Sequence, residues 1–177
     1  MEKEIRESYR ITEKDFLQMS ILRSRYLTPK ENKIILRIVG IIATVGGAAA
    51  FINIRGNIYQ TICWFLLIGV GLYVFSYYDV TDPFLTYKQA QAFYRYNSES
   101  FNSKTVIFTP TLFSINDDSH KLSVPPEYIH SAVEGKNTLI IFIDNEQYYF
   151  IPKRVLSEDK LSVIREIIGE EKYKKEV

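Results

Sequence analysis

Cysteine is almost absent from this chain, and its first residues lack an apolar stretch. The one cysteine, Cys63, lies in an apolar run, so no disulfide can form within the chain. The lack of disulfides agrees with a reducing compartment around the polar part of the chain. The first stretch, MEKEIRESYRITEKDF, is charged throughout and contains no apolar core. We therefore expect no secretory signal peptide.

Signatures of catalysis and of metal binding are also missing. None of the 8 glycines forms a phosphate-binding loop between a strand and a helix. The two histidines, His120 and His130, have neither the spacing nor the thiolate neighbours of a zinc site. Asp117 and Asp118 lie in a short turn that cannot surround calcium with enough oxygen ligands. Because no serine or cysteine stands in a nucleophile motif, we predict a protein that is not an enzyme and has no cofactor or metal.

The C-terminal part has no excess of positive charge. From Asp79 onward the chain has 12 Lys or Arg and 15 Asp or Glu, whereas residues 1–57 have 10 and 6. Binding to nucleic acid depends on cations that neutralise phosphates, and a mildly acidic domain lacks them. We therefore expect no nucleic acid among the partners.

Charge is also missing from residues 38–78, where Arg55 is the only charged residue. The apolar segments 34–54 and 58–78 lie on either side of it, and each would form a helix about 31 Å long, close to the thickness of a bilayer's hydrocarbon core. A soluble protein would have to bury two helices that are apolar on all sides, and the remaining chain is too short for that. We predict a transmembrane helical hairpin over residues 34–78.

Small residues are regularly spaced in the first apolar segment. Gly40, Ala43, Gly47 and Ala50 fall on one face of a helix, where a second helix can approach closely. We predict that these residues form the helix–helix packing surface, and the same face could also serve a homo-oligomer. No acidic or basic residue lies deep in either segment, as an ion pathway would require. An anchor is therefore favoured over a channel.

Basic residues near the ends of the segments predict the orientation. Arg23, Arg25, Lys30 and Lys33 precede the first segment, whereas a single arginine lies at the tip. Because cytoplasmic loops carry the excess of Lys and Arg, both termini are expected in the cytoplasm. The stretch NIRGN would then be the outer tip, with Gly56 permitting the reversal of the chain.

Residues 1–30 are predicted to form a cytoplasmic strand and helix. The strand is SYRIT, and the helix follows it with Thr12 and Asp15 spaced as a capping box. Pro29 disfavours a helical conformation at the residue before it, so the helix should end there. A juxtamembrane helix and a linker are expected over 79–103. The N-terminal strand and helix should pack on the C-terminal domain, because both emerge on the same side of the membrane.

The periodicity changes from helix to strand at Lys104, and residues 104–177 are predicted to form a cytoplasmic domain. Short breaks rich in turn formers favour an antiparallel meander. A final helix should begin at Ser157 and end at Gly169, followed by a solvated tail. The predicted strands are 105–110, 112–116, 121–125, 130–134, 138–144 and 147–152. The fold class is therefore α+β, a membrane hairpin plus a small antiparallel sheet or partial barrel that the last helix closes, as in a pleckstrin-homology-like (PH-like) domain.

Three parts of the chain carry a resemblance to a known family. They are ITEKDFLQMS near the front, the paired apolar segments, and VPPEYIHSAVEGKNTLIIFIDNEQYYFIPKRVLSEDKLSVIREII, in which YYFIPKRVL is the most distinctive piece. On these residues the sequence resembles the YcxB-like family of bacterial membrane proteins. The resemblance implies two helices in a bacterial inner membrane, followed by a PH-like domain. It implies no activity.

The turn before the last helix, PKRVLSEDK, is the best surface candidate for binding. Lys153 and Arg154 could contact lipid phosphate or an acidic partner, or they could form a solvated turn paired with Glu158 or Asp159. We expect a membrane-anchored interaction or regulatory module with an unidentified protein partner. The alternatives are recognition of anionic lipid at the inner leaflet, through this turn and the basic residues before the first segment, and immunity to a membrane-active toxin.

Overall fold

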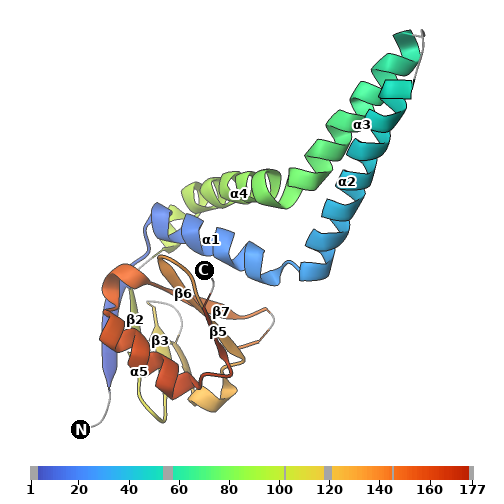
Figure 1. The fold of residues 1–177 in the computed structure, drawn as a ribbon. Coiled ribbons are helices and arrows are strands. Elements are labelled where there is room, and N and C mark those ends of the chain that lie inside the picture. Colours follow the sequence, from blue (N-terminus) through green and yellow to red (C-terminus); the bar gives the residue numbers. More distant parts are fainter. Residues whose placement is uncertain (1–3, 54–57, 102, 118–120, 145, 176–177) are drawn as a thin grey trace. The chain divides into compact units, whose positions relative to one another are not determined.

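The structure is a computed structural model, and it describes residues 4–53, 58–101, 103–117, 121–144 and 146–175. The chain divides into two compact units (Figure 1). The sheet unit comprises Met1–Arg23 and Gln89–Val177, and the hairpin unit comprises Ser24–Lys88. The predicted hairpin tip and the predicted turn residue His120 lie outside the described residues.

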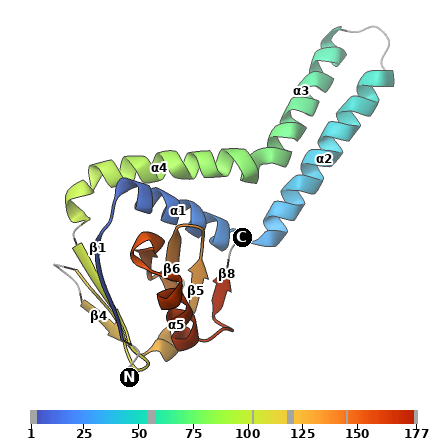
Figure 2. The ribbon, with the colours of Figure 1, turned by 60° about the vertical axis from the view of Figure 1, so that its left-hand side comes forward.

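Two four-stranded sheets build the sheet unit (Figure 2). In the first sheet the order is β1-β2-β3-β4, and every neighbouring pair is antiparallel. In the second sheet the order is β7-β6-β5-β8, and only β8 runs parallel to its neighbour, β5. The strands are β1 (Ile5–Arg10), β2 (Ser103–Phe108), β3 (Phe113–Asn116), β4 (Lys121–Val124), β5 (Ser131–Glu134), β6 (Thr138–Phe142), β7 (Tyr148–Pro152) and β8 (Tyr173–Lys175).

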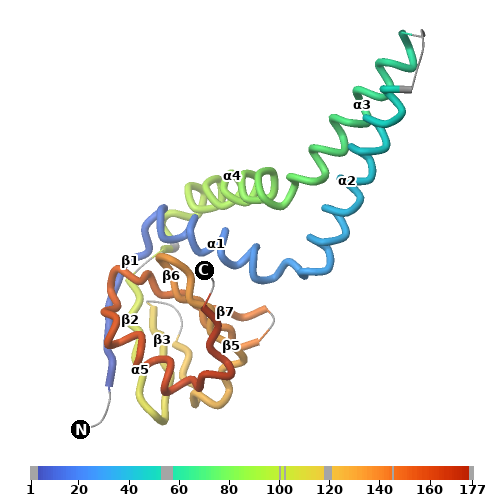
Figure 3. The backbone as a smooth tube through the Cα atoms, viewed as in Figure 1, coloured from blue at the N-terminus to red at the C-terminus, as the bar shows by residue number. Residues whose placement is uncertain are grey.

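The N-terminal strand completes the first sheet. β1 is paired along its whole length with β2, from Ile5 opposite Phe108 to Arg10 opposite Ser103 (Figure 3). Ile5 and Tyr9 are buried while their neighbours along the strand are more exposed, as expected for a strand with one face on the core. The predicted packing of the N-terminal strand on the C-terminal domain is confirmed.

The core of the sheet unit centres on the second sheet. β5 and β6 are buried along their whole length, as expected for central strands that are covered on both faces. The last helix, α5 (Glu158–Ile168), adds three buried side chains to this core, and they are Leu161, Ile164 and Ile168. Ser157 caps this helix through its side chain, and Gly169 ends it with φ 94°, a conformation that favours glycine. Both predicted ends of the helix are confirmed.

The first helix, α1 (Glu13–Leu27), begins with the predicted capping box. The Thr12 backbone N–H donates to Asp15 Oδ2 at 3.0 Å, and the Asp15 N–H donates to Thr12 Oγ1 at 3.2 Å. Farther along, Leu22 lies directly against Gly135, where an added Cβ would come within 2.7 Å of Leu22 Cδ2. This contact packs the helix onto the C-terminal domain, as predicted.

The hairpin unit consists of two long helices that lie side by side (Figures 1 and 2). The first is α2 (Lys30–Asn53) and the second is α3 (Ile58–Ser76), which continues through a π-helical turn (Tyr77–Thr81) into α4 (Asp82–Tyr96). Both are long and apolar enough to cross a membrane. Helix α2 begins four residues before the predicted segment, and the predicted juxtamembrane helix runs on from α3 with no break.

Glycines allow the two helix backbones to touch. An added Cβ at Gly40 would come within 2.6 Å of the Phe75 backbone N, and one at Gly71 within 2.7 Å of the Thr44 backbone N. On α2, Gly47 is also buried against α3. The other two predicted packing residues, Ala43 and Ala50, are half-buried on α2. The small residues therefore serve packing within the chain, and packing between copies stays a prediction.

Arg37 is paired within the hairpin unit. Its Nη2 donates to both carboxylate oxygens of Asp79 at 2.9 Å, which joins the first turns of α2 to the π-helical turn after α3. Both side chains are about half exposed, at 48% and 55%.

The prediction of one six-stranded meander is wrong in its connections. All six strands exist, but a 3₁₀ turn (Pro126–Tyr128) separates β4 from β5, so that three strands enter each sheet. The predicted solvated tail is also wrong in part, because Tyr173, Lys174 and Lys175 pair with β5 as strand β8. The pairing of β8 with β5 has no local signature, since it joins segments that are far apart in the chain.

Candidate functional site

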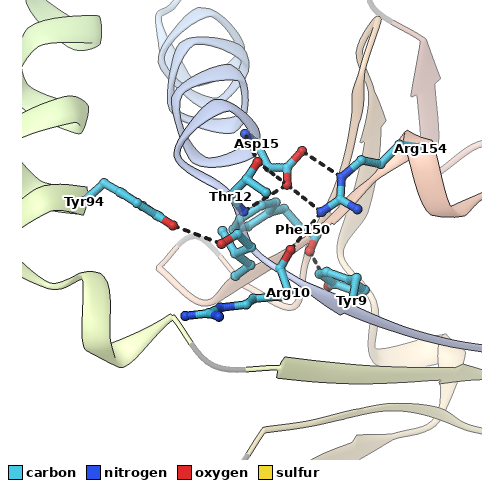
Figure 4. A network of polar contacts seen from close by, with 8 residues as sticks. Tyr9, Arg10, Thr12, Asp15, Tyr94, Phe150 and Arg154 are labelled. Carbon is cyan, nitrogen blue, oxygen red and sulfur yellow. Dashed lines mark hydrogen bonds and ion pairs between the residues drawn. The ribbon is translucent and has the colours of Figure 1, made fainter.

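A buried carboxylate, Asp15, ties three elements of the sheet unit together (Figure 4). Asp15 is 6% exposed and accepts hydrogen bonds from the Thr12 hydroxyl at 2.7 Å and from Arg154 Nη2 at 2.8 Å. The same Arg154 Nη2 donates to the Arg10 carbonyl oxygen at 2.8 Å. The end of β1, the first turn of α1 and the 3₁₀ turn after β7 (Lys153–Val155) are therefore held by one guanidinium.

The surroundings of Asp15 keep it ionised. Burial acts to raise the pKa of the Asp15 carboxyl, but the hydrogen bonds from Arg154 and Thr12 outweigh it and hold the pKa below its usual value. The same pair raises the pKa of the Arg154 guanidinium, chiefly through its hydrogen bond to Asp15. An acid held in this way stabilises the fold and is a poor proton donor near neutral pH.

Two tyrosines complete the polar network of Figure 4. Tyr9 donates its hydroxyl to the Phe150 carbonyl oxygen at 2.6 Å, and Tyr94 donates to the Ile11 carbonyl oxygen at 3.1 Å. Burial and the nearby charge of Asp15 raise the pKa of the Tyr9 hydroxyl. Tyr9 therefore stays protonated and joins β1 to β7 of the other sheet.

A second buried carboxylate, Glu134 at the end of β5, is surrounded by cations. It is 1% exposed and accepts from Lys153 Nζ at 2.6 Å, from the Tyr173 hydroxyl at 2.8 Å and from Arg165 Nη2 at 3.2 Å. Lys175 Nζ lies 3.9 Å from the same carboxylate. Glu134 thus connects β5 with α5, with β8 and with the 3₁₀ turn that carries Lys153.

The charges around Glu134 also keep it ionised. Burial acts to raise its pKa, but the hydrogen bonds from Lys153 and Tyr173 and the nearby cations lower the pKa below its usual value. Burial and the hydrogen bond to Glu134 in turn raise the pKa of the Tyr173 hydroxyl. Both partners therefore keep the protonation states in which they bond to each other.

Asp15 and Lys153, the partner of Glu134, both line a cleft with a volume of about 330 Å³. We call it the basic cleft, and it is lined by Lys14, Asp15, Gln18, Asn137, Lys153 and Arg154. Lys14 and Gln18 come from the first turns of α1, and Asn137 precedes β6. The Asn137 carbonyl oxygen accepts from the Lys153 backbone N–H at 2.8 Å, which fixes one wall of the cleft to the other.

The structure brings together the two residues predicted in the PKRVL turn, Lys153 and Arg154, in the basic cleft. Their partners are Glu134 and Asp15, so the expected pairing with Glu158 or Asp159 is wrong. Lys153 is 17% exposed and Arg154 is 49% exposed at the side chain. Arg154 is thus the more accessible cation of the two.

The four predicted basic residues before the first apolar segment have different surroundings. Arg23 belongs to the sheet unit, where its guanidinium stacks 4.3 Å from the centre of the Tyr148 ring. Arg25, Lys30 and Lys33 belong to the hairpin unit, in which Lys33 Nζ donates to the Arg25 carbonyl oxygen at 3.2 Å. Contact of these residues with lipid stays a prediction.

Sequence reasoning missed Lys14, Gln18, Asn137 and Glu134. The first three are ordinary polar residues in a helix and a turn, and no local pattern marks them. Glu134 has a weak signal, because it is the one acid in the predicted strand HSAVE, which a short turn separates from the apolar strand that follows. In the described residues there is no group of three or more His, Cys, Asp or Glu side chains that could hold a metal ion.

Comparison with known proteins finds a family match to part of the chain. Residues 121–168 match the family model described as YcxB-like protein. The match runs from β4 to α5 and includes Glu134, Asn137, Lys153 and Arg154, whereas Lys14 and Gln18 lie outside it. The resemblance to this family is confirmed over these residues. No curated protein and no solved structure matches the chain.

Proposed function

We propose that this chain is a membrane-anchored interaction or regulatory module without catalytic activity. In this proposal the two helices of the hairpin unit cross the membrane, and the sheet unit is a PH-like domain that contacts a partner. The observation that carries the proposal is the apolar surface of the hairpin. In the most apolar stretch of α2 only 11% is buried, and in the most apolar stretch of the helix that begins with α3 only 6% is buried.

The exposed apolar side chains of the hairpin need a cover. They occur along the length of both helices, and an apolar patch of this size on a soluble protein would promote association. Lipid chains supply such a cover, and the helices satisfy their own backbone groups. Some of the side chains concerned are Ile38, Ile42, Val45, Ile52, Ile62, Phe65, Leu66 and Val70.

An orientation with both termini in the cytoplasm of a bacterial cell belongs to the same proposal. It is supported by Arg25 in the last turn of α1 and by Lys30 and Lys33 in the first turn of α2, because such residues are retained on the cytoplasmic side. The PH-like assignment is supported by two antiparallel-rich sheets and by the helix α5, which follows β7. The absence of catalysis is supported by Asp15 and Glu134, the most buried acids described, which are both engaged in ion pairs.

Accessibility of single cysteines tests the anchor and its orientation together. In a Cys63→Ala background, Ile58→Cys at the start of α3 should react with an impermeant thiol reagent added to intact cells. Ser123→Cys, on the exposed side of β4, should react only after the cells are lysed. The protein should also stay in the pellet when membranes are washed with carbonate at high pH. Release by carbonate would contradict the anchor, and the reverse labelling would contradict the orientation.

Recognition of anionic lipid at the inner leaflet is a second candidate function. It is supported by Arg25 in the last turn of α1 and by Lys30 at the start of α2. Both are exposed just before the apolar part of α2, where they would lie close to lipid head groups. The full chain in bilayers should then enrich phosphatidylglycerol around itself, and salt should weaken the effect. Equal enrichment of neutral lipid would contradict this candidate.

A further inference from the structure

We infer that the basic cleft binds a small ligand through a phosphate group. This inference rests on the proposed function, because it names the class of ligand that the module would recognise. The cleft is formed by three separate parts of the chain, which are the first turns of α1, the residue before β6, and the turn after β7. Its lining and its charge favour an anion over any other kind of ligand.

Positively charged side chains outnumber negatively charged ones in and beside the cleft. Asp15 is matched by Arg154, with which it shares two hydrogen bonds. Glu134 carries one negative charge and faces the cations Lys153, Arg165 and Lys175. Lys14 adds a further positive charge at the edge of the cleft. The local sum is therefore clearly positive, and an anion would lower the repulsion among these cations.

The cleft also offers hydrogen-bond donors that point to phosphate. The Lys153 ammonium has three donors and gives one of them to Glu134. The Arg154 guanidinium bonds to Asp15 through Nε and Nη2, so that the two N–H groups of Nη1 lie on its outer side. Lys14 and the amides of Gln18 and Asn137 complete the set. Charge-assisted bonds from such donors are those that proteins use for phosphate.

Burial and bonding make the cleft ready to bind before a ligand arrives. Arg154 is oriented by Asp15 and by the Arg10 carbonyl oxygen, and Lys153 is oriented by Glu134. Little side-chain entropy would therefore be lost on binding. The volume of about 330 Å³ is near the lower end of the range for small-molecule sites, which is about 300–1,000 Å³. The cleft thus has room for a phosphate with a small organic group attached.

A phosphate group can come from a free small molecule or from a lipid head group, and the experiment separates these sources. The full chain is placed in nanodiscs of phosphatidylcholine, and inorganic phosphate or glycerol 3-phosphate is added. Backbone amide NMR signals of Lys14, Asn137 and Lys153 report binding. A second preparation replaces phosphatidylcholine with phosphatidylglycerol and receives no phosphate. Lys14→Gln is the test variant, because Lys14 is exposed and its loss should leave the fold intact.

Lys136→Gln is the matched control, since it removes an exposed lysine beside Asn137 that does not line the cleft. We expect saturable shifts with the free phosphates. The affinity should be about tenfold lower in Lys14→Gln, as loss of one charged hydrogen bond implies. In Lys136→Gln the affinity should change by less than about twofold. Shifts that occur only with phosphatidylglycerol, and that Lys14→Gln abolishes, would support the same site with lipid as the source.

The inference is overturned if neither phosphate nor phosphatidylglycerol shifts these signals. It is also overturned if the two variants weaken binding equally, because the effect would then be general attraction by surface charge. Failure of the proposed function would be seen separately, as chain that does not remain in the nanodiscs. A chain that stays in the lipid and binds no anion would refute this inference alone.

Discussion

The sheet unit and the hairpin unit hold their parts together by different means. In the sheet unit, two nearly inaccessible carboxylates, Asp15 and Glu134, tie together segments from both ends of the chain. In the hairpin unit, Gly40 and Gly71 allow the backbones of two helices to touch, and the ion pair Arg37–Asp79 lies at the surface. The comparison shows that one unit depends on compensated charge and the other on steric fit.

The physical reason is the kind of surface that each unit must join. The contact between the two apolar helices includes the polar side chain of Thr44, whose hydroxyl bonds to the Gly40 carbonyl oxygen of its own helix, so the fit of the backbones decides how the helices pack. The sheet unit joins a helix start, a turn and two strand ends, which all bring unpaired backbone or side-chain groups. A buried acid with several donors satisfies such groups at one point. The predictions below test this contrast, from the largest expected effect to the smallest.

The largest effect is expected from Arg154→Met in the sheet unit. The substitution leaves Asp15, which is 6% exposed, without its cation. Losing one partner of a fully buried pair costs about 3 kcal/mol, and the 49% exposure of the Arg154 side chain makes the expected cost somewhat smaller. Thermal unfolding of the full chain in detergent, followed by circular dichroism, should show a clearly lower melting temperature. The double variant Arg154→Met/Asp15→Leu should recover part of the loss. An unchanged melting temperature in Arg154→Met would show that Asp15 does not hold these elements together.

The next effect is expected from Gly71→Ala in the hairpin unit. The added Cβ would lie 2.7 Å from the Thr44 backbone N and 2.9 Å from the Gly40 carbonyl oxygen, so the helices must separate, at a cost of about 1–3 kcal/mol. Gly69→Ala is the matched control, because nothing lies within 4 Å of a Cβ at that position. A disulfide-trapping or proteolysis assay of the hairpin should distinguish the two variants. Equal behaviour of both would contradict close packing of α2 on α3.

Acid should weaken the sheet unit more than the hairpin unit. The pKa values of Asp15 and Glu134 are lowered in the folded state, so the unfolded state binds protons first as the pH falls. The stability that these acids contribute is complete above their unfolded pKa values of about 4, and it is lost below that range. Amide hydrogen exchange between pH 6 and pH 3 should show the loss in β5 and α1.

The effect of acid should be smaller than that of Arg154→Met, since a protonated carboxyl can still accept hydrogen bonds. Glu134→Gln provides the control, because a chain without this acid should lose less stability between pH 6 and pH 3. Stability that rises as the pH falls through this range would contradict the direction of both pKa shifts.

The smallest effect is expected from Asp79→Asn, which removes the ion pair with Arg37. Both side chains are about half exposed, at 48% and 55%, and exposed pairs contribute at most about 1 kcal/mol. The melting temperature in detergent should therefore fall by much less than in Arg154→Met. A loss as large as that of Arg154→Met would show that the hairpin also depends on compensated charge, and it would remove the contrast between the units.

Several features were predictable because their signals are local. The capping box at Thr12 and Asp15 and the end of the last helix at Gly169 each follow from a few neighbouring residues. The basic pair Lys153 and Arg154 was identified as a candidate site from its place in a turn. What these two residues contact was not predictable, because Asp15 lies 139 positions away from Arg154 in the chain.

The sequence by itself determined the two apolar helices, the positions of the strands from residue 103 to 152, and the ends of the last helix. Each depends on a periodic or capping pattern among residues that are close together in the chain, and such a pattern can be read from the sequence. Only the tertiary structure decided that the strands divide into two sheets, that β8 joins β5, and that Lys14, Asn137 and Lys153 line one cleft. These features depend on contacts between distant segments, and such contacts arise from packing of the whole unit.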